Sequence, residues 1–417
     1  MEIKRDYYLN EIKKRMHNGM IKIITGIRRC GKSYLLFELF YNHLINNGVS
    51  PNHIIRVDLE DRRNRRLRDP DMLLQFIDSQ MNDNQMYYIF LDEVQYVSEF
   101  EDVLNSYLKV KNADVYVTGS NSKFLSKDVI TEFRGRGDEI KIAPLSFSEY
   151  YAVYQGTQQQ ALAQYLTYGG LPKLVEMTDN IQRQKYLIDL FATTYLKDIK
   201  ERYGIRQEDE MNELIRILAS AIGGLTNPTK LSNTFKSIKH IDISKNTIIS
   251  YLNILQEVFM VEKSIRFDIK GKKYINTPAK YYFSDMGLRN AIIQFRQPEP
   301  THQLENLVFN ELLRRGFTVD VGVVTVNESR ADGSYGKKQL EVDFVCNQGD
   351  KRCYIQSAYR LPDEAKMRQE LRSLNVIDDS FTKVVITDEP ILRHRNNDGI
   401  VFMNFYDFLL DDNSLVL

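Results

Sequence analysis

The sequence contains few cysteines, no net charge and no long apolar run. Its 417 residues include three cysteines, which argues against a disulfide framework and fits a reducing, cytoplasmic environment. Lys plus Arg and Asp plus Glu both number 56, so any surface for nucleic acid or a membrane must be local. No apolar stretch approaches the ~20 residues needed to span a bilayer, and the first residues lack the apolar core of a signal peptide. We therefore expect a cytoplasmic protein with no membrane partner.

A phosphate-binding loop is predicted at residues 26–33, whose sequence GIRRCGKS fits the pattern G-x-x-x-x-G-K-[ST] at every fixed position. Glycines at both ends let backbone N–H groups surround a triphosphate, while Lys32 reaches the β- and γ-phosphates and Ser33 binds Mg²⁺. An apolar strand over residues 20–25 precedes the loop, and a helix over residues 33–40 follows it. An incidental glycine turn is the alternative, but this context favours nucleotide binding. The residues predicted to contact ATP are Gly26, Arg28, Arg29, Cys30, Gly31, Lys32, Ser33 and Tyr34.

A second nucleotide signature lies at residues 86–93, where a strand of bulky apolar residues ends in two carboxylates. A strand buried on both faces delivers such acids to a phosphate site at its carboxyl end. We expect Asp92 to hold Mg²⁺ and Glu93 to act as the general base on the attacking water. Many strands end in acids, so the prediction depends on the position of this strand after the phosphate loop.

Polar side chains that could act on the γ-phosphate follow the next strand, residues 113–121. Asn121 is the first candidate for orienting water and Ser120 the second; an ordinary polar turn with an Asn cap is the alternative. Two arginines then stand on a glycine-bearing loop, and Arg136, or else Arg134, is the candidate arginine finger. A surface ion pair is the alternative for Arg136.

The alternation of strands and helices predicts an α/β fold with a parallel sheet covered on both faces and the ligand at the carboxyl ends of the strands. Residues 25–33, 90–95, 118–122 and 144–150 together resemble the predicted prokaryotic AAA+ ATPases that carry a C-terminal domain of unknown function similar to restriction endonucleases. The resemblance runs over nearly the whole chain. It implies an ATPase that uses ATP and Mg²⁺, with the roles above carried by Lys32, Ser33, Asp92, Glu93, Asn121 and Arg136.

Four parts are expected on this basis. They are a P-loop ATPase domain (1–145), a helical lid (146–204), a winged-helix domain (205–275) and a restriction-endonuclease-like domain (276–417). The winged helix is predicted from three helices followed by a strand pair.

Two basic surfaces of the predicted domains could bind DNA. The first combines the polar face of the third winged-helix helix with lysines of the wing; its residues are Lys245, Asn246, Thr247, Tyr251, Lys270, Lys272 and Lys273. Such a domain can also serve only in packing. The second is the arginine-rich stretch 62–68, which either binds a polyanion or forms ion pairs with Asp61, Asp69 and Asp71.

The C-terminal part shows the order α-β-β-β-α-β: a helix over 304–315, a strand over 319–321, a hairpin over 340–357, a helix over 364–374 and a strand over 383–387. A nuclease of this type needs acids from the first helix and the hairpin and an E-x-K on the next strand. Glu305 and Asp343 stand at the first two positions, but Gln356 and Ala358 occupy the third, and both are poor substitutes. We therefore expect no nuclease activity, and a docking or nucleic-acid-binding role instead. The plainer alternative is that Glu305 and Asp343 make only local pairs, although Lys351 or Arg352 could replace the missing lysine.

Two function classes follow from these motifs. The first is an ATP-hydrolysing motor or switch, in a possible homo-oligomer, that acts on DNA. The alternative is a nucleotide-gated signalling or scaffolding protein that recruits a protein partner and turns over slowly.

Overall fold

The computed structural model describes residues 3–119, 135–205, 207–329 and 335–415. The chain divides into two compact units, each with its own sheet. The N-terminal unit comprises Met1–Pro144, Leu171–Glu176 and Glu257–Phe259, and the C-terminal unit comprises Leu145–Gly170, Met177–Gln256 and Met260–Leu417. The four-part division at residues 145, 204 and 275 remains a prediction.

The N-terminal unit is built on a five-stranded sheet in the order β2-β3-β4-β1-β5. All four strand pairs are parallel, which confirms the predicted parallel α/β sheet. Its strands are β1 (Ile21–Thr25), β2 (Ile54–Asp58), β3 (Tyr87–Asp92), β4 (Ala113–Thr118) and β5 (Gly137–Lys141). Because β1 and β3 are buried along their whole length, both faces of the sheet must be covered by helices.

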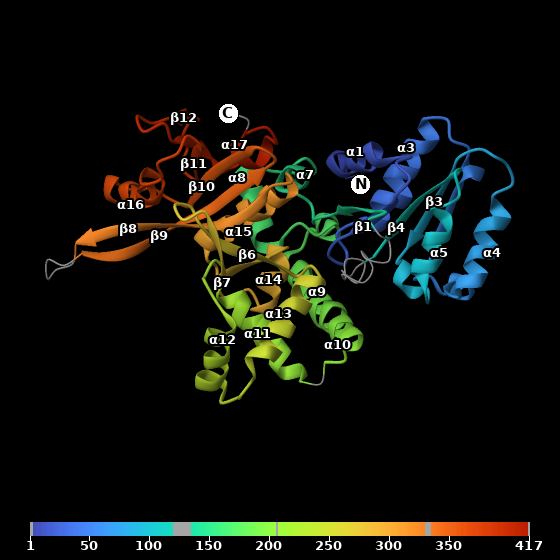
Figure 1. Ribbon diagram of the computed structural model, residues 1–417, viewed down its shortest axis with the longest axis horizontal. Coiled ribbons are helices and arrows are strands. Elements are labelled where there is room, and N and C mark those ends of the chain that lie inside the picture. The colour runs from blue at the N-terminus through green and yellow to red at the C-terminus, as the bar shows by residue number, and fades with distance from the viewer. Residues whose placement is uncertain (1–2, 120–134, 206, 330–334, 416–417) are drawn as a thin grey trace. The chain divides into compact units, whose positions relative to one another are not determined.

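Helices cover the two faces of this sheet, as Figure 1 shows. One face packs on apolar side chains of α4 and α5, which form a common core with β1–β4. The other receives the helix that follows β1, through contacts of Phe40 with Phe90 and Tyr116. The helices are α1 (Asp6–Arg15), α2 (Lys32–Tyr34), continued through a π-helical segment (Leu35–Phe40) into α3 (Tyr41–Asn46), α4 (Pro70–Gln80) and α5 (Phe100–Tyr107).

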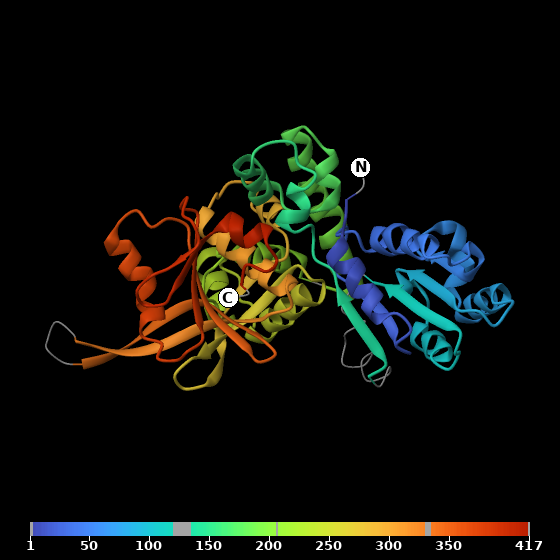
Figure 2. The same cartoon turned by 90° about the horizontal axis from the view of Figure 1, so that it is seen from above.

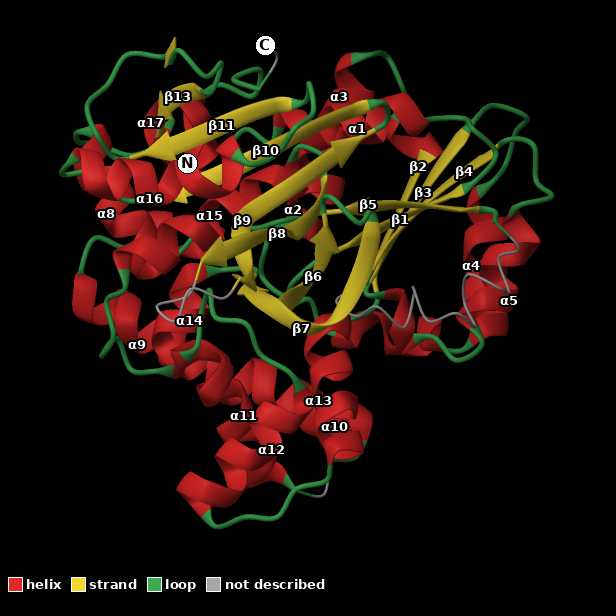
Figure 3. Ribbon diagram, turned by 60° about the vertical axis from the view of Figure 1, so that its left-hand side comes forward, coloured by secondary structure: helices red, strands yellow, loops and turns green. Residues whose placement is uncertain are grey.

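The C-terminal unit begins with helices, as the sequence predicts for the region after residue 146. These are α7 (Phe147–Tyr151), α8 (Gln158–Tyr168), α9 (Asn180–Leu190), α10 (Lys197–Tyr203), α11 (Glu208–Ser220), α12 (Pro228–Thr234) and α13 (Lys245–Glu257). Figure 3 shows α11, α12 and α13 gathered beside the β6–β7 end of the second sheet.

The second sheet has eight strands in the order β12-β13-β11-β10-β9-β8-β6-β7. They are β6 (Val261–Asp268), β7 (Lys273–Phe283), β8 (Thr318–Ser329), β9 (Tyr335–Gln348), β10 (Lys351–Ala358), β11 (Thr382–Thr387), β12 (His394–Arg395) and β13 (Val401–Asn404). The strands β8 and β9 reach well beyond their neighbours (Figure 2). Because β6 pairs with both β7 and β8, the predicted wing belongs to the same sheet as the C-terminal strands, and residue 275 lies inside β7.

Four helices accompany this sheet: α14 (Met286–Ile292), α15 (Pro300–Arg314), α16 (Glu364–Asn375) and α17 (Phe405–Leu410). The chain order α15-β8-β9-β10-α16-β11 is the one expected from the sequence. The turn between β9 and β10 falls at Gly349 and Asp350, within the hairpin predicted over residues 340–357.

The glycine pair after α8 has a structural cause within the C-terminal unit. The N–H of Gly170 donates to Asp285 Oδ2 at 2.7 Å, and Asp285 also caps α14 by accepting from the N–H of Leu288 at 3.0 Å. At Gly169, φ is +78°, and a Cβ there would lie 2.2 Å from Asp285 Oδ1. Glycine is therefore required at residue 169, where the backbone closely approaches a buried carboxylate.

Two further observations concern the cysteines and the helices. Cys30, Cys346 and Cys353 are all free thiols and all buried. Within the described ranges, no helix combines the length and apolar character that crossing a bilayer requires.

Candidate nucleotide-binding site

The loop after β1 adopts a conformation that only glycine permits at its ends. Gly26 has φ +140°, and a Cβ there would lie 2.2 Å from the carbonyl oxygen of Ile142. Gly31 has φ +101° and directly precedes α2. The two glycines thus let the backbone turn tightly between β1 and the helix, as a phosphate-binding loop requires.

Lys32 lies inside this loop. Its side chain is buried, with 5% of the residue exposed, and Nζ donates to the carbonyl oxygens of Gly26 at 3.1 Å and Ile27 at 3.4 Å. The ammonium is therefore held at the concave side of the loop, where the β- and γ-phosphates of a nucleotide would lie.

A carboxylate and two hydroxyls meet at the carboxyl ends of β3 and β4. Thr118, which is fully buried, donates its hydroxyl hydrogen to Asp92 Oδ1, and the Ser33 hydroxyl is hydrogen-bonded to the same carboxylate. Burial raises the pKa of Asp92, as do the charges of Glu93 and Asp58, while the hydrogen bonds from Thr118 and Ser33 act in the opposite direction. The Ser33 and Asp92 oxygens form the hard donor set that suits Mg²⁺.

Glu93 stands next to this cluster in a strained backbone conformation. Its φ and ψ are +52° and +50°, in the left-handed region that non-glycine residues rarely adopt. The N–H of Glu93 donates to Thr118 Oγ1 at 3.0 Å, and the Gln95 amide donates to Glu93 Oε2. Thr118 thereby connects both acids of the strand end.

Thr118 is a residue that sequence reasoning missed, because attention fell on the more polar Asn121. The available signal was its position as the last residue of β4, beside the strand that carries Asp92. Asn121, Ser120 and Arg134 lie outside the described residues, so their roles stay predictions.

The other predicted loop residues differ in their exposure and in their contacts. Arg28 forms an ion pair with Glu60 at 2.9 Å, while Arg29 and Tyr34 are exposed. Cys30 points away from the loop's concave side: it is completely buried, with Sγ 3.6 Å from the carbonyl oxygen of Ile142, and burial raises its thiol pKa. Only the backbone of Cys30 is thus available to a nucleotide.

Arg5 supports the loop from outside it, and no sequence motif pointed to this residue. Its guanidinium donates to the carbonyl oxygen of Cys30 at 3.0 Å and to that of Ala143 at 2.7 Å, and it lies 4.7 Å from the ring centre of Tyr8. A buried arginine therefore joins the phosphate loop to the segment after β5.

Arg136 lies at the amino ends of the strands, whereas its own phosphate loop lies at their carboxyl ends. It directly precedes β5, whose first residue, Gly137, pairs with Ile21 at the start of β1. The loop follows the other end of β1, about 16 Å away for five residues at about 3.3 Å each. The exposed Arg136 can thus serve as an arginine finger only for the nucleotide of another subunit.

The arginine-rich stretch 62–68 makes local bonds. Arg63 pairs with Asp61 at 2.5 Å, and Arg68 donates to the carbonyl oxygen of Leu59 at 2.8 Å. Asp69 caps α4 by accepting from the N–H of Met72. These contacts favour the local interpretation over a polyanion site at this segment.

In the C-terminal unit, a lysine lies beside Glu305, where a nuclease of this type would hold a metal ion. Lys280 of β7 is 3% exposed, and its Nζ lies 2.7 Å from Glu305 Oε1 and 2.8 Å from Glu341 Oε1. The Tyr282 hydroxyl donates to the same Glu305 oxygen at 2.7 Å. The Lys280 ammonium is therefore paired with the carboxylate oxygens that a metal cation would need as ligands.

The remaining nuclease positions are also engaged. Asp343 accepts from the N–H of Ser357 at 2.8 Å, and the Gln356 amide donates to Glu370 at 3.1 Å. Burial and the neighbouring Glu305 charge raise the pKa of Asp343. For Glu305, burial acts to raise the pKa, but Lys280, His302 and Tyr282 together lower it. In the part of the chain that the structure describes, no group of three or more His, Cys, Asp or Glu side chains is arranged to hold a metal.

One predicted DNA-contacting residue is wrong. Tyr251 was placed on the polar face of α13, but it is buried, and its hydroxyl donates to the carbonyl oxygen of Gln207 at 3.3 Å. Lys245 and Asn246 are exposed, as predicted. Tyr251 follows the buried Ile248 by three residues and precedes the buried Leu255 by four, so it borders the apolar face of α13. Packing against the segment before α11 then buries it.

Comparison with known proteins agrees with the fold and the loop. Residues 18–151 match a family described as an AAA domain, and residues 159–299 match a domain of unknown function, a segment that crosses residues 204 and 275. The N-terminal part is thus a P-loop domain of the AAA class.

The chain belongs to the same family as an uncharacterized protein of Haemophilus influenzae, to which it is 33% identical over 414 residues, 98% of each chain. An uncharacterized protein of Methanocaldococcus jannaschii is 27% identical over 412 residues, covering 92% of this chain and 88% of that one. AMPPCP-bound DnaA from Aquifex aeolicus is 14% identical, with 60% of this chain and 86% of that chain covered and a TM-score of 0.26. That score is too low to carry an argument.

Proposed function

We propose that this protein is a Mg²⁺-dependent AAA+ ATPase that hydrolyses ATP. The observation that carries the proposal is the meeting of Ser33, Asp92 and Thr118 beside a phosphate-type loop whose Lys32 ammonium is held at its concave side. Ser33 and Asp92 would hold Mg²⁺, which neutralises phosphate charge when bound. The buried Asp92 fits that ion, because a cation there would offset the burial and, to a smaller extent, the repulsion from Glu93 and Asp58 that raise its pKa.

Glu93 is the proposed general base. It would accept a proton from the water that attacks the γ-phosphate, while Lys32 stabilises the charge on the phosphate oxygens. Asn121 is proposed to orient that water. The hydrogen bond from Thr118 to Asp92, together with the bond it accepts from the N–H of Glu93, would hold the Asp92 carboxylate and the Glu93 backbone in place for these roles.

The first experiment separates ATP binding from hydrolysis. Lys32→Ala should abolish tight ATP binding, because the phosphates lose their nearest cation, and Glu93→Gln should keep binding but lose turnover. Binding is measured with a fluorescent ATP analogue and turnover by phosphate release. Lys14→Ala, an exposed lysine paired with Glu11 in the same unit, is the matched control. Unchanged turnover in Glu93→Gln would remove Glu93 from the mechanism.

A nucleotide-gated switch with slow turnover is the second candidate, and one contact favours it. The Gln95 amide occupies Glu93 Oε2, so the base is engaged before any partner binds. If this bond restrains turnover, Gln95→Ala should raise the basal rate of phosphate release, with ATP affinity unchanged. A rate equal to or below that of the parent protein counts against gating by Gln95.

We also infer that the C-terminal unit does not cut nucleic acid. Hydrolysis of a phosphodiester needs several carboxylate oxygens around a metal, and here Glu305 is paired with Lys280 while Gln356 and Ala358 supply neither an acid nor a lysine. Incubation of the protein with single- and double-stranded DNA and RNA in Mg²⁺ or Mn²⁺ should leave them intact. Cleavage that disappears in Asp343→Ala would overturn this inference.

A further inference from the structure

The region around α12, α13 and the start of β7 is basic in a chain of zero net charge. Residues 226–275 contain nine Lys or Arg and four Asp or Glu. The wing lysines Lys270, Lys272 and Lys273 are all exposed. Because the whole chain has no net charge, a surface that attracts a polyanion must carry a local excess of positive charge, and this region does.

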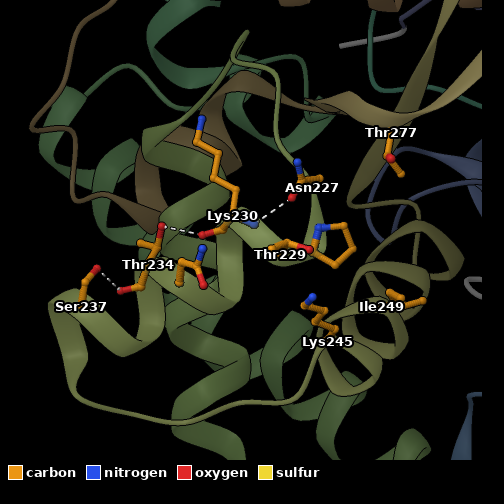
Figure 4. A pocket seen from close by; sticks show the side chains of 10 residues that line it. Asn227, Thr229, Lys230, Thr234, Ser237, Lys245, Ile249 and Thr277 are labelled. Atoms are coloured by element: carbon orange, nitrogen blue, oxygen red, sulfur yellow. Dashed lines mark hydrogen bonds between the residues drawn. The ribbon is translucent and has the colours of Figure 1, made fainter.

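An open groove of about 780 Å³ lies within this region, and Figure 4 shows side chains of α12, α13 and β7 around it. Its lining residues are Asn227, Pro228, Thr229, Lys230, Asn233, Thr234, Ser237, Lys245, Ile249 and Thr277. Of these ten, two are lysines, six carry a hydroxyl or an amide, and none is acidic. The lining thus offers hydrogen-bond donors and positive charge without a carboxylate to repel an anion.

Buried contacts hold the walls of the groove in place. Thr226 and Ala279 exchange two backbone hydrogen bonds of 2.9 Å, which fixes the start of α12 beside β7. The Ser232 hydroxyl donates to the carbonyl oxygen of Ile243 at 3.0 Å, which ties α12 to the segment before α13. Leu231 of α12, Phe235 directly after it, and Ile248 and Leu252 of α13 are buried, so the polar residues of the groove project from helices whose other faces are packed.

We propose that this groove binds the phosphate backbone of a nucleic acid. Lys230 and Lys245 would each face a phosphate, and Thr229, Asn233 and Thr277 would donate hydrogen bonds to phosphate oxygens, the commonest contacts in such interfaces. The apolar Ile249, 43% exposed, would contact sugar. The contacts position a backbone and read no base edges, so DNA and RNA share the chemistry.

Nucleic acid would be the partner of the proposed ATPase. What the binding serves rests on that proposed function, but binding in the groove itself needs no nucleotide. The α12 side chains were outside the surface predicted from sequence, which comprised α13 and the wing. The α12 side chains belong to the proposed binding surface because α12 forms the wall of the groove that faces α13.

Binding is tested by fluorescence anisotropy with labelled duplex DNA, single-stranded DNA and RNA of one length at several salt concentrations. The full chain should bind at least one probe, with affinity falling as salt rises. The variant Lys230→Gln/Lys245→Gln should bind at least about tenfold more weakly, and its salt slope against duplex DNA should be smaller by about 2, the value for two lost phosphate contacts. Lys14→Gln/Lys185→Gln, which removes two lysines elsewhere, is the charge-matched control.

Three outcomes overturn the proposal: no probe binds the folded protein, the groove variant binds as well as the control variant, or polyglutamate competes as well as nucleic acid. The last would indicate an acidic protein partner. If the double variant unfolds, Lys245→Gln alone is used, because Lys230 donates to the carbonyl oxygen of Leu225. Lys32→Ala should bind the probes normally, so that loss of ATP binding and loss of nucleic-acid binding remain distinguishable.

Discussion

At the scale of single residues, one hydroxyl connects the two acids of the nucleotide site. Thr118 donates to Asp92 and accepts from the backbone of Glu93, although Thr118 ends β4 whereas Asp92 ends β3 and Glu93 directly follows it. A side chain without direct contact to the substrate can still set the position of the groups that act on it.

Replacing this hydroxyl should impair catalysis more than binding. Thr118→Val keeps the shape but loses both hydrogen bonds, so we expect kcat to fall about 10- to 100-fold while the Kd for ATP without Mg²⁺ changes little. Thr118→Ser keeps the hydroxyl and is the control. A Thr118→Val protein with parental kcat would mean that the strand end holds the acids by itself.

The second residue-scale prediction concerns Lys280. Removal of one partner from a buried ion pair leaves an unpaired charge, so Lys280→Met should destabilise the C-terminal unit by about 3–5 kcal/mol. Adding Glu305→Gln removes the uncompensated charge and should recover part of this loss. Urea unfolding monitored by circular dichroism measures both variants. A loss of less than about 0.5 kcal/mol in Lys280→Met would show that the lysine does not neutralise a buried Glu305 charge.

At the scale of elements, the phosphate loop depends on the segment that precedes α1. Arg5 reaches the carbonyl oxygens of Cys30 and Ala143 across 25 and 138 residues of sequence. These bonds position the loop against the end of the sheet, so the segment before α1 supports the candidate nucleotide site.

Loss of these bonds should loosen the loop. Arg5→Met removes both hydrogen bonds but keeps an apolar chain against Tyr8, and we expect about tenfold weaker ATP binding, equivalent to about 1.4 kcal/mol. The melting temperature should fall as well. Lys4→Met, at an exposed neighbouring position, should change neither. Parental ATP affinity in Arg5→Met would limit Arg5 to a role in stability.

At the scale of the whole molecule, the placement of Arg136 makes the number of chains decisive. Arg136 lies at the end of the strands that is away from its own phosphate loop. A catalytic arginine at this position therefore has to act on the nucleotide of a neighbouring subunit. A monomer could not use it.

Turnover should therefore depend on association. Specific ATPase activity should rise with protein concentration, and inactive Lys32→Ala and Arg136→Ala chains should partly restore each other's activity when mixed, since one supplies the arginine and the other the intact loop. Light scattering gives the mass in parallel. A strictly monomeric protein with concentration-independent turnover would contradict this prediction.

The sequence by itself determined the features that neighbouring residues encode. The loop of residues 26–33, the acids that end β3 and the parallel order of the first sheet follow from local spacing and alternation, because a few consecutive residues fix the backbone there. The hairpin at residues 349–350 and the order of elements after residue 300 follow for the same reason.

Only the tertiary structure decided which distant side chains join these features. Thr118 and Asp92 are 26 residues apart, and Arg5 and Ala143 are 138 apart. Lys280 is paired with Glu305, at a position where an active nuclease of this type would hold a metal. The burial of Tyr251 and the facing of α12 and α13 across a groove were likewise decided by packing. Sequence periodicity indicates which face of an element is apolar, whereas the partner of each polar group depends on where the chain returns in space, which no local pattern specifies.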